Sequence, residues 1–194
     1  SKVVVSSRKL DQCEETAAEI NAACGEERAI AIACNIGYKE QLQALVDETR
    51  ERLGPIDTLI ANAGVNPFYG PMSEIPDEAF DKTMNSNLRS NHWLCQMVAP
   101  DMLEKGRGAI MITASVGAFG PSDTLGTYNI SKMADIALVR NLAMEWGPKG
   151  IRVNALCPGL IRTDFAKALW DNPEAAKRVT EQTPMRRFGE ADDF

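Results

Sequence analysis

Tyr128 and Lys132 are the two residues whose types and spacing could support acid–base chemistry. They stand four positions apart in a long apolar run that predicts a helix over 128–146, so their side chains share one face. A free phenol titrates near pH ~10, but a fixed cation close by favours the phenolate and lowers its pKa. Such a tyrosine could exchange a proton with a substrate at neutral pH.

Ser115 adds a hydroxyl to this pair. It follows a short apolar run over 109–113 that predicts a strand, and open α/β sheets bind their ligands at the carboxyl ends of parallel strands. With Ser115 thirteen positions before Tyr128, the sequence resembles the short-chain dehydrogenase/reductase family, whose signature is that serine followed by Tyr-x-x-x-Lys. The resemblance extends over 3–189.

Short apolar runs that predict strands alternate along the chain with stretches that predict helices. This alternation indicates βαβ units with right-handed crossovers, and therefore a doubly wound, Rossmann-like parallel sheet in a three-layer αβα fold. We expect the first strand to be buried, and Pro100 to bend or break the long helix that contains it. The expected strands cover 2–6, 29–34, 58–61, 109–113 and 152–156, and the expected helices cover 10–24, 38–53, 77–104 and 128–146.

The chain has 194 residues, of which 44% are hydrophobic, enough for one domain with a core and too few for two ordinary domains. With the family resemblance, we expect one dinucleotide-binding oxidoreductase domain over 1–194. Within it, the polar and helix-prone segment 159–190 is expected to form a mobile substrate loop, or lid. Its Phe165, Leu169 and Trp170 indicate an apolar pocket beneath.

Charge and cysteine usage exclude several classes of protein. The net charge of −6 and the absence of a basic run argue against a nucleic-acid partner or an anionic membrane surface. The five cysteines lack Cys-x-x-Cys spacing, as in proteins of a reducing compartment, and no apolar run approaches the ~18 residues that span a bilayer. We expect a cytoplasmic protein. Because His92 is the only histidine, a Ser-His-Asp hydrolase and a histidine-rich metal site both lack their residues.

A dinucleotide-binding fold needs a glycine-rich turn after its first strand, where backbone N–H groups bind the pyrophosphate. The single Gly-x-Gly of this sequence, at 106–108, precedes an expected strand and is interpreted as a loop turn. The resemblance aligns 2–6 with the family's second strand, which implies that the first strand and its turn lie before Ser1 and the last strand after Phe194. We therefore expect a sequence clipped at both ends, with two unpaired strand edges inside the sheet.

The resemblance implies catalytic roles for Tyr128, Lys132 and Ser115. Tyr128 would protonate the carbonyl oxygen during reduction. Lys132 would lower the pKa of the phenol and hydrogen-bond the nicotinamide ribose. Ser115 would hydrogen-bond the substrate carbonyl, although a serine in a turn has this appearance in many proteins.

Asn87 is implied as a fourth catalytic residue, which holds a water that links the lysine to solvent. Asn85 and Asn91 are nearby alternatives. We prefer Asn87 because an aromatic–Asp pair at 80–81 stands seven and six positions before it, as in the family. An asparagine inside a helix is unfavourable, which also indicates a specific role.

Cofactor choice depends on Ser7 and Arg8, at the end of the first expected strand. An acidic residue there binds the ribose 2′-hydroxyl of NAD, whereas its absence beside an arginine accommodates the 2′-phosphate of NADP. We therefore predict NADP, with NAD as the less favoured alternative. The resemblance also implies cofactor contacts for Tyr128 and Lys132, and for Asn35, Asn62, Ala63, Gly64, Pro158, Gly159 and Thr163.

The expected activity is hydride transfer between NADP(H) and a small ketone, aldehyde or alcohol. Three stretches, 66–70, 158–163 and 186–190, resemble the carbonyl/retinal reductase branch of the family. The alternative is a non-catalytic cofactor-binding or scaffold protein of the same fold, which the complete set of four catalytic residues argues against. The helix over 128–146 is apolar nearly all round, which predicts a homo-oligomer, a dimer or a tetramer.

Overall fold

The computed structural model describes residues 1–193, with the side chains of residues 168, 169 and 175 outside the description. Strands alternate with helices along the chain, as the hydrophobic pattern predicts. The strands are β1 (Val3–Ser7), β2 (Ala29–Ala33), β3 (Thr58–Ala61), β4 (Gly108–Thr113) and β5 (Ile151–Leu156). The helices are α1 (Leu10–Cys24), α2 (Lys39–Leu53), α3 (Asp77–Met84), α4 (Ser90–Lys105), α5 (Gly126–Trp146), α6 (Lys167–Trp170) and α7 (Pro173–Gln182).

Every strand pair in the described residues is parallel, and the pairs form two sheets. In the first sheet β1 pairs with β2, with Val3 opposite Ala29. In the second, β4 lies between β3 and β5, with Gly108 opposite Ile151. The Rossmann-like parallel architecture is therefore confirmed, and its strands lie in two groups.

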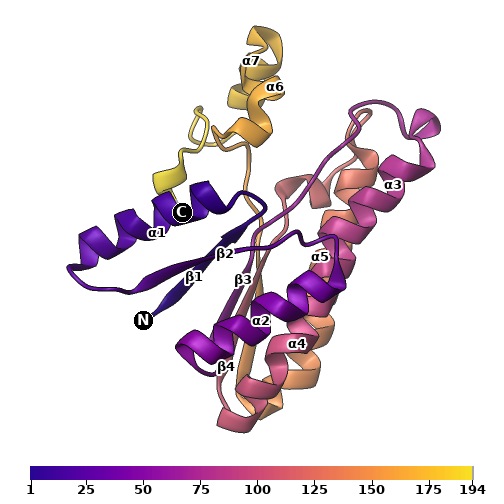
Figure 1. Cartoon of the computed structure of the whole chain (residues 1–194). Helices are drawn as coiled ribbons and strands as arrows, with labels where there is room; N and C mark the ends of the chain where they lie inside the picture. The colour runs from indigo at the N-terminus through magenta and orange to yellow at the C-terminus, as the bar shows by residue number, and fades with distance from the viewer. Residues whose placement is uncertain (194) are drawn as a thin grey trace.

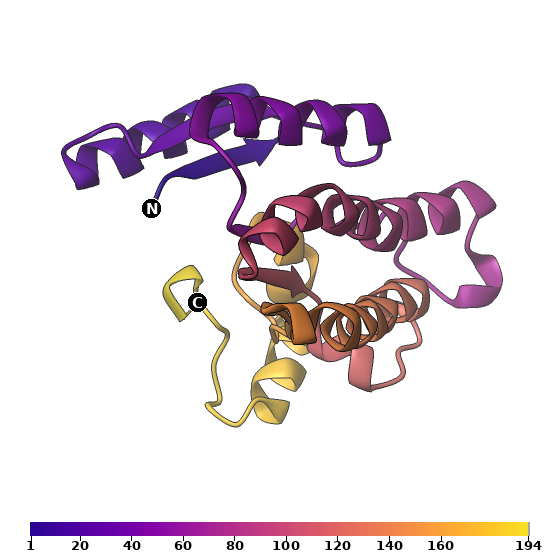
Figure 2. The ribbon, with the colours of Figure 1, turned by 90° about the horizontal axis from the view of Figure 1, so that it is seen from below.

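Helices pack on these strands from two sides, with α1 on one side of the molecule and α2, α4 and α5 on the other (Figure 1). Helix α1 packs on β1 and β2, whereas α4 and α5 pack on the β3–β5 sheet and α2 packs against α4. Viewed from below, α4 and α5 lie side by side (Figure 2). The main core fills the space between the second sheet and these helices, and is formed by side chains that include Leu42, Val98, Met102, Ile110, Ile112, Leu142, Trp146, Ile151 and Val153.

The prediction that the first strand is buried is wrong. Val3 of β1 is 41% exposed, and Ile60 of β3 is 61% exposed. Both strands pair on one edge only within the described residues, and a helix packs on each of them from one face, so side chains on the other face stay open to water. Apolar strand residues become buried only where strands and helices surround them.

The long helix also differs from the prediction. It continues through Pro100 as part of α4, and its irregularity lies earlier, in a π-helical turn over Asn85–Arg89 where the Ser90 N–H bonds to the Asn85 carbonyl. Proline removes one helical N–H donor, and the carbonyl that loses it belongs to Gln96, which is exposed to water. The helix therefore tolerates Pro100 without a break.

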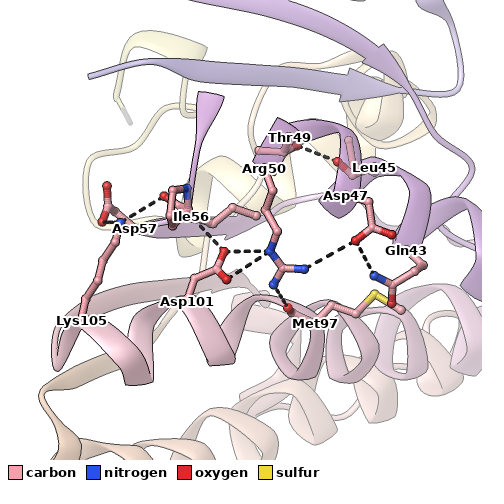
Figure 3. Close-up of polar contacts among 11 residues, drawn as sticks. Gln43, Leu45, Asp47, Thr49, Arg50, Ile56, Asp57, Met97, Asp101 and Lys105 are labelled. Carbon is pink, nitrogen blue, oxygen red and sulfur yellow. Dashed lines mark hydrogen bonds and ion pairs between the residues drawn. The ribbon is translucent and has the colours of Figure 1, made fainter. Parts of the chain in front are cut away.

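An ion pair between α2 and α4 fixes one side of the second sheet (Figure 3). Arg50 Nε lies 3.0 Å from Asp101 Oδ2, and an Arg50 nitrogen donates to the Met97 carbonyl at 2.6 Å. The same carboxylate accepts the Ile56 N–H at 2.9 Å, just before β3. Burial raises the pKa of Asp101, but hydrogen bonds from Arg50 and Ile56 and the Arg50 charge outweigh it and hold that pKa below its usual value.

Candidate active site

The predicted site residues follow the carboxyl ends of the strands. Ser7 ends β1 and Asn35 follows β2, whereas Asn62, Ser115 and Pro158 follow β3, β4 and β5. Because strands within each sheet are parallel, these ends share one edge of their sheet. The candidate site consists of these two strand edges, one on each sheet.

The structure brings Tyr128, Lys132 and Ser115 together. Tyr128 lies in the first turns of α5, close enough to Ser115 for that hydroxyl to lower the pKa of the phenol. Lys132 Nζ lies 5.8 Å from the centroid of the Tyr128 ring. Ser115 holds the start of a 3₁₀ turn, because its hydroxyl accepts the Gly117 N–H at 3.1 Å. Tyr128 and Lys132, four residues apart on α5, and Ser115, which follows β4, thus lie together, as the sequence predicts.

Lys132 is almost completely buried, with 3% of its surface exposed. Its ammonium donates to the Thr113 carbonyl, at the end of β4, over 2.8 Å. It also lies 3.3 Å from a carboxylate oxygen of Asp135, which is fully buried. The sequence reasoning missed Asp135. Its spacing of three from Lys132, which also places two residues on one helix face, was the signal that could have found it.

The pKa of Tyr128 is raised above its usual value, which makes the predicted lowering wrong. Burial is the main cause, the negative charge of Asp135 adds to it, and the hydrogen bond with Ser115 opposes it. The prediction considered Lys132 as a cation alone. In the structure its charge is paired with Asp135, so its pull on the phenol is weakened.

Asn87 lies in the π-helical turn and is completely buried. Its amide accepts the Val65 N–H at 2.8 Å, donates to the Val65 carbonyl at 2.9 Å and donates to the Ser131 hydroxyl at 3.0 Å. It therefore joins the loop after β3 to α5. Gly64 stands beside it: a Cβ there would lie 3.5 Å from both the Asn87 amide oxygen and Lys132 Nζ. These Val65 and Ser131 contacts carried no sequence signal.

The two alternative asparagines differ from Asn87 in their surroundings. Asn85 is half-buried in the same turn. Asn91 is buried in α4, where its amide donates to the Asn87 carbonyl at 2.6 Å and to Asp135 at 2.9 Å. Asn91 therefore links the turn that carries Asn87 to the buried carboxylate.

Ser7, Arg8 and Asn35 lie at the edge of the β1–β2 sheet, apart from the sheet that ends at Ser115. The Ser7 hydroxyl accepts the Lys9 N–H at 3.1 Å, and Arg8 is exposed. The Asn35 side chain accepts the Gly37 N–H at 3.1 Å, which shapes the loop before α2. Thus Ser7, Arg8 and Asn35 lie on one sheet, whereas the other residues implied for the cofactor follow strands of the second sheet or lie on α5.

The residues after β5 lie next to the Ser115 turn, since the Pro158 carbonyl accepts the Val116 N–H at 2.9 Å. Gly159 and the exposed Thr163 continue this segment, and the Thr163 carbonyl accepts the Trp170 indole N–H at 3.0 Å. Phe165, which is 61% exposed, lies with its ring centroid 6.2 Å from that of Tyr128. The Leu169 side chain falls outside the described residues.

The side chains along these two edges fit a dinucleotide in their chemistry. Arg8 offers an exposed guanidinium for a phosphate, whereas Asn35 and Asn62 offer amides next to strand ends. Gly64 leaves the space beside Lys132 free of a side chain. A glycine-rich turn after a strand, which would bind the pyrophosphate, is not among the described residues. No group of three metal-ligating side chains and no helix able to cross a membrane occurs in the described part of the chain.

Comparisons with known proteins agree with this architecture. A family model described as enoyl-(acyl carrier protein) reductase matches residues 1–194. Human dehydrogenase/reductase SDR family member 4 is 38% identical over 192 residues, which are 98% of this chain and 68% of that protein.

Two solved structures show the same fold. A gluconate 5-dehydrogenase from Burkholderia cenocepacia, in complex with NADP and tartrate, has a TM-score of 0.92 at 26% identity, over 100% of this chain and 74% of the other. A 7α-hydroxysteroid dehydrogenase, with NADH and 7-oxo glycochenodeoxycholic acid, has a TM-score of 0.91 at 36% identity, over 99% and 73%.

Proposed function

Because this chain belongs to the short-chain dehydrogenase/reductase family, we propose that it transfers a hydride between NADP(H) and a ketone, an aldehyde or a secondary alcohol. The family makes the chain an NAD(P)-dependent oxidoreductase that acts on CH–OH or carbonyl groups. The observation that supports a reaction at this particular site is that Lys132 Nζ lies 5.8 Å from the Tyr128 ring and that Ser115 acts on the same phenol.

Each of the four residues has a role in this proposal. In the direction of reduction, Tyr128 gives its hydroxyl proton to the carbonyl oxygen, and Ser115 donates a hydrogen bond to that oxygen. Lys132 stabilises the phenolate that remains. Asn87 holds the loop after β3 against α5, next to Lys132. The nicotinamide cofactor supplies the hydride, and the reverse direction returns the proton to Tyr128.

The preference for NADP rests on Ser7 and Arg8. Ser7 puts no negative charge at the end of β1, and Arg8 presents a guanidinium to solvent, a pairing that favours a 2′-phosphate. One of the related structures holds NADP and the other NADH, so they leave this choice to the residues themselves. The proposed cofactor contacts continue through Asn35, Asn62, Ala63, Gly64, Tyr128, Lys132, Pro158, Gly159 and Thr163.

The substrate would enter beneath the segment 159–190, which we propose as the lid of a single domain over 1–194. Phe165 of this segment lies against the Tyr128 ring, so an apolar group of the substrate would contact it. The resemblance of the loop after β3 to the carbonyl reductase branch supports carbonyl compounds as substrates. Nothing basic or membrane-directed in the composition points to a polymeric partner.

We also propose a homo-oligomer, a dimer or a tetramer, in the cytoplasm. Helix α5 leaves Ile130, Met133 and Met144 exposed, with Met144 at 81%, although its other faces pack on the sheet and on α4. Exposed apolar side chains grouped on one helix are typical of a subunit interface. Sedimentation that shows only monomer at micromolar concentration would contradict this.

The experiment that tests the proposed function is turnover of a panel of ketones and aldehydes with NADPH by the Tyr128→Phe variant. Turnover should be lost while NADPH binding, measured by fluorescence titration, stays nearly unchanged. Tyr38→Phe, an exposed tyrosine at the start of α2, is the matched control and should keep full activity. NADPH binding by the unmodified protein without turnover of any carbonyl would favour the alternative, a non-catalytic cofactor-binding protein.

A further inference from the structure

Asp135 is a fully buried carboxylate that the proposed reaction does not use. One oxygen lies 3.3 Å from Lys132 Nζ, and the other accepts the Asn91 amide at 2.9 Å. We propose that Asp135 is a positioning residue for the acid–base step, a counter-ion that holds Lys132 in place and weakens its pull on the Tyr128 phenol. This inference rests on the proposed function, because it concerns the same tyrosine.

The position of Lys132 explains why a counter-ion is needed. A buried ammonium is costly unless acceptors replace the water that it loses. Lys132 has the Thr113 carbonyl on the sheet side and Asp135 on its own helix, and these two acceptors fix Nζ at 5.8 Å from the Tyr128 ring. Without Asp135 the ammonium would keep the carbonyl alone, and its whole charge would act on the phenol.

Asn91 ties the carboxylate to the rest of the site. The Asn91 amide nitrogen carries two hydrogens, and it donates one to Asp135 and the other to the Asn87 carbonyl at 2.6 Å. A continuous set of contacts therefore runs from Asn87 through Asn91 and Asp135 to Lys132. The Asp135 carboxylate thus connects Asn87 and Lys132, two of the four proposed catalytic residues. The surface charges on α5 make no such connection.

The titratable groups that face Asp135 are Lys132 and Tyr128 on α5 and Cys95 on α4. Burial raises the pKa of Cys95 to about 12, with a further contribution from Asp135, so this thiol stays neutral. Burial also raises the pKa of Asp135, while the Lys132 charge and the Asn91 and Lys132 hydrogen bonds oppose that rise. In its carboxylate form, Asp135 accepts a hydrogen bond from Lys132 on one oxygen and from the Asn91 amide on the other.

The test is the titration of Tyr128 in the Asp135→Asn variant, followed by NMR of ring-labelled tyrosine. The chain has three tyrosines, and Tyr128→Phe assigns the relevant signal. Removal of the charge should move the Tyr128 titration to lower pH by about one unit, and the pH profile of kcat by a similar amount. An unchanged titration would overturn the proposal. This readout needs no turnover. If the proposed function fails and the inference about Asp135 holds, Asp135→Asn should still shift the Tyr128 titration, while the unmodified protein reduces no carbonyl compound.

Two controls separate charge from packing. Asn91→Ala keeps the carboxylate and removes its amide partner, so it should give no shift to lower pH. Asp101→Asn removes a partly buried carboxylate that pairs with Arg50 of α2, and should lower stability without moving the Tyr128 titration (Figure 3). A shift to lower pH in either control equal to that of Asp135→Asn would contradict a specific role for Asp135.

A second pair of variants keeps the proposal testable if Asp135→Asn does not fold. Lys132→Met leaves Asp135 buried without its partner, whereas Lys132→Met/Asp135→Leu removes both charges. The double variant should have the higher melting temperature of the two. A double variant no more stable than Lys132→Met would show that the two charges do not interact, and would overturn the proposal.

Discussion

Replacement of Asn87 by alanine tests whether this residue holds the site together. The side chain makes three hydrogen bonds, two with the Val65 backbone and one with Ser131, from a completely buried position. Each is worth about 1 kcal/mol net, so the free energy of unfolding should fall by about 3 kcal/mol. The loss in the free energy of unfolding is larger if the Val65 N–H finds no other acceptor, because an unpaired buried donor adds its own cost.

Urea denaturation followed by tryptophan fluorescence measures this loss. With a slope of about 2 kcal/mol per molar, typical of small proteins, the midpoint should fall by about 1.5 M. Asn85→Ala is the matched control, since Asn85 lies in the same π-helical turn and is half-buried. It should cost less than about 1 kcal/mol. If the two variants lose the same stability, the Val65 and Ser131 contacts do not carry the energy assigned to them.

Two further predictions concern charge. The pKa of Asp101 in the folded protein is held below its usual value, so its pairing with Arg50 contributes to stability. This contribution is fully present above the pKa of the unfolded chain, about 3.9, and is lost as the pH falls through the lower pKa of the folded protein. The stability difference between the unmodified protein and Asp101→Asn, from denaturation curves, should therefore shrink below about pH 4; a constant difference contradicts it. Arg8→Ala should raise the KM for NADPH at least about tenfold and leave that for NADH nearly unchanged, since a lost charged hydrogen bond costs about 1.5–3 kcal/mol. Equal changes in steady-state kinetics with both cofactors would remove Arg8 from the 2′-phosphate site.

The elements with strong local signals were predicted almost to the residue. Helix α1 spans Leu10–Cys24 as expected, and it ends at Gly25 because this glycine has φ 69° in the left-handed region. Strand β3 occupies Thr58–Ala61 and helix α2 begins one residue after its expected start. In these elements hydrophobic period, length and turn residues all point to the same structure.

The features that the sequence did not reveal depend on tertiary neighbours. The sequence predicts one long helix over 77–104 with its irregularity at Pro100, yet the chain forms a π-helical turn where Asn87 meets the Val65 backbone. No local propensity encodes that contact, since Val65 lies in the loop after another strand. The exposure of Val3 has the same origin, because burial of a strand depends on which strands lie beside it.

The Tyr128 pKa shows why spacing alone gave the wrong direction. A tyrosine and a lysine four residues apart predict a lowered pKa when the cation acts alone, and the two side chains do meet. The fold buries Lys132, partly buries Tyr128 and adds Asp135, so loss of hydration and a nearby negative charge raise the pKa of the phenol while the lysine is paired. The site therefore behaves as a nearly neutral Lys–Asp pair beside a phenol. In such a site the proton affinity of the phenol depends first on its burial and then on its neighbours Ser115 and Asp135.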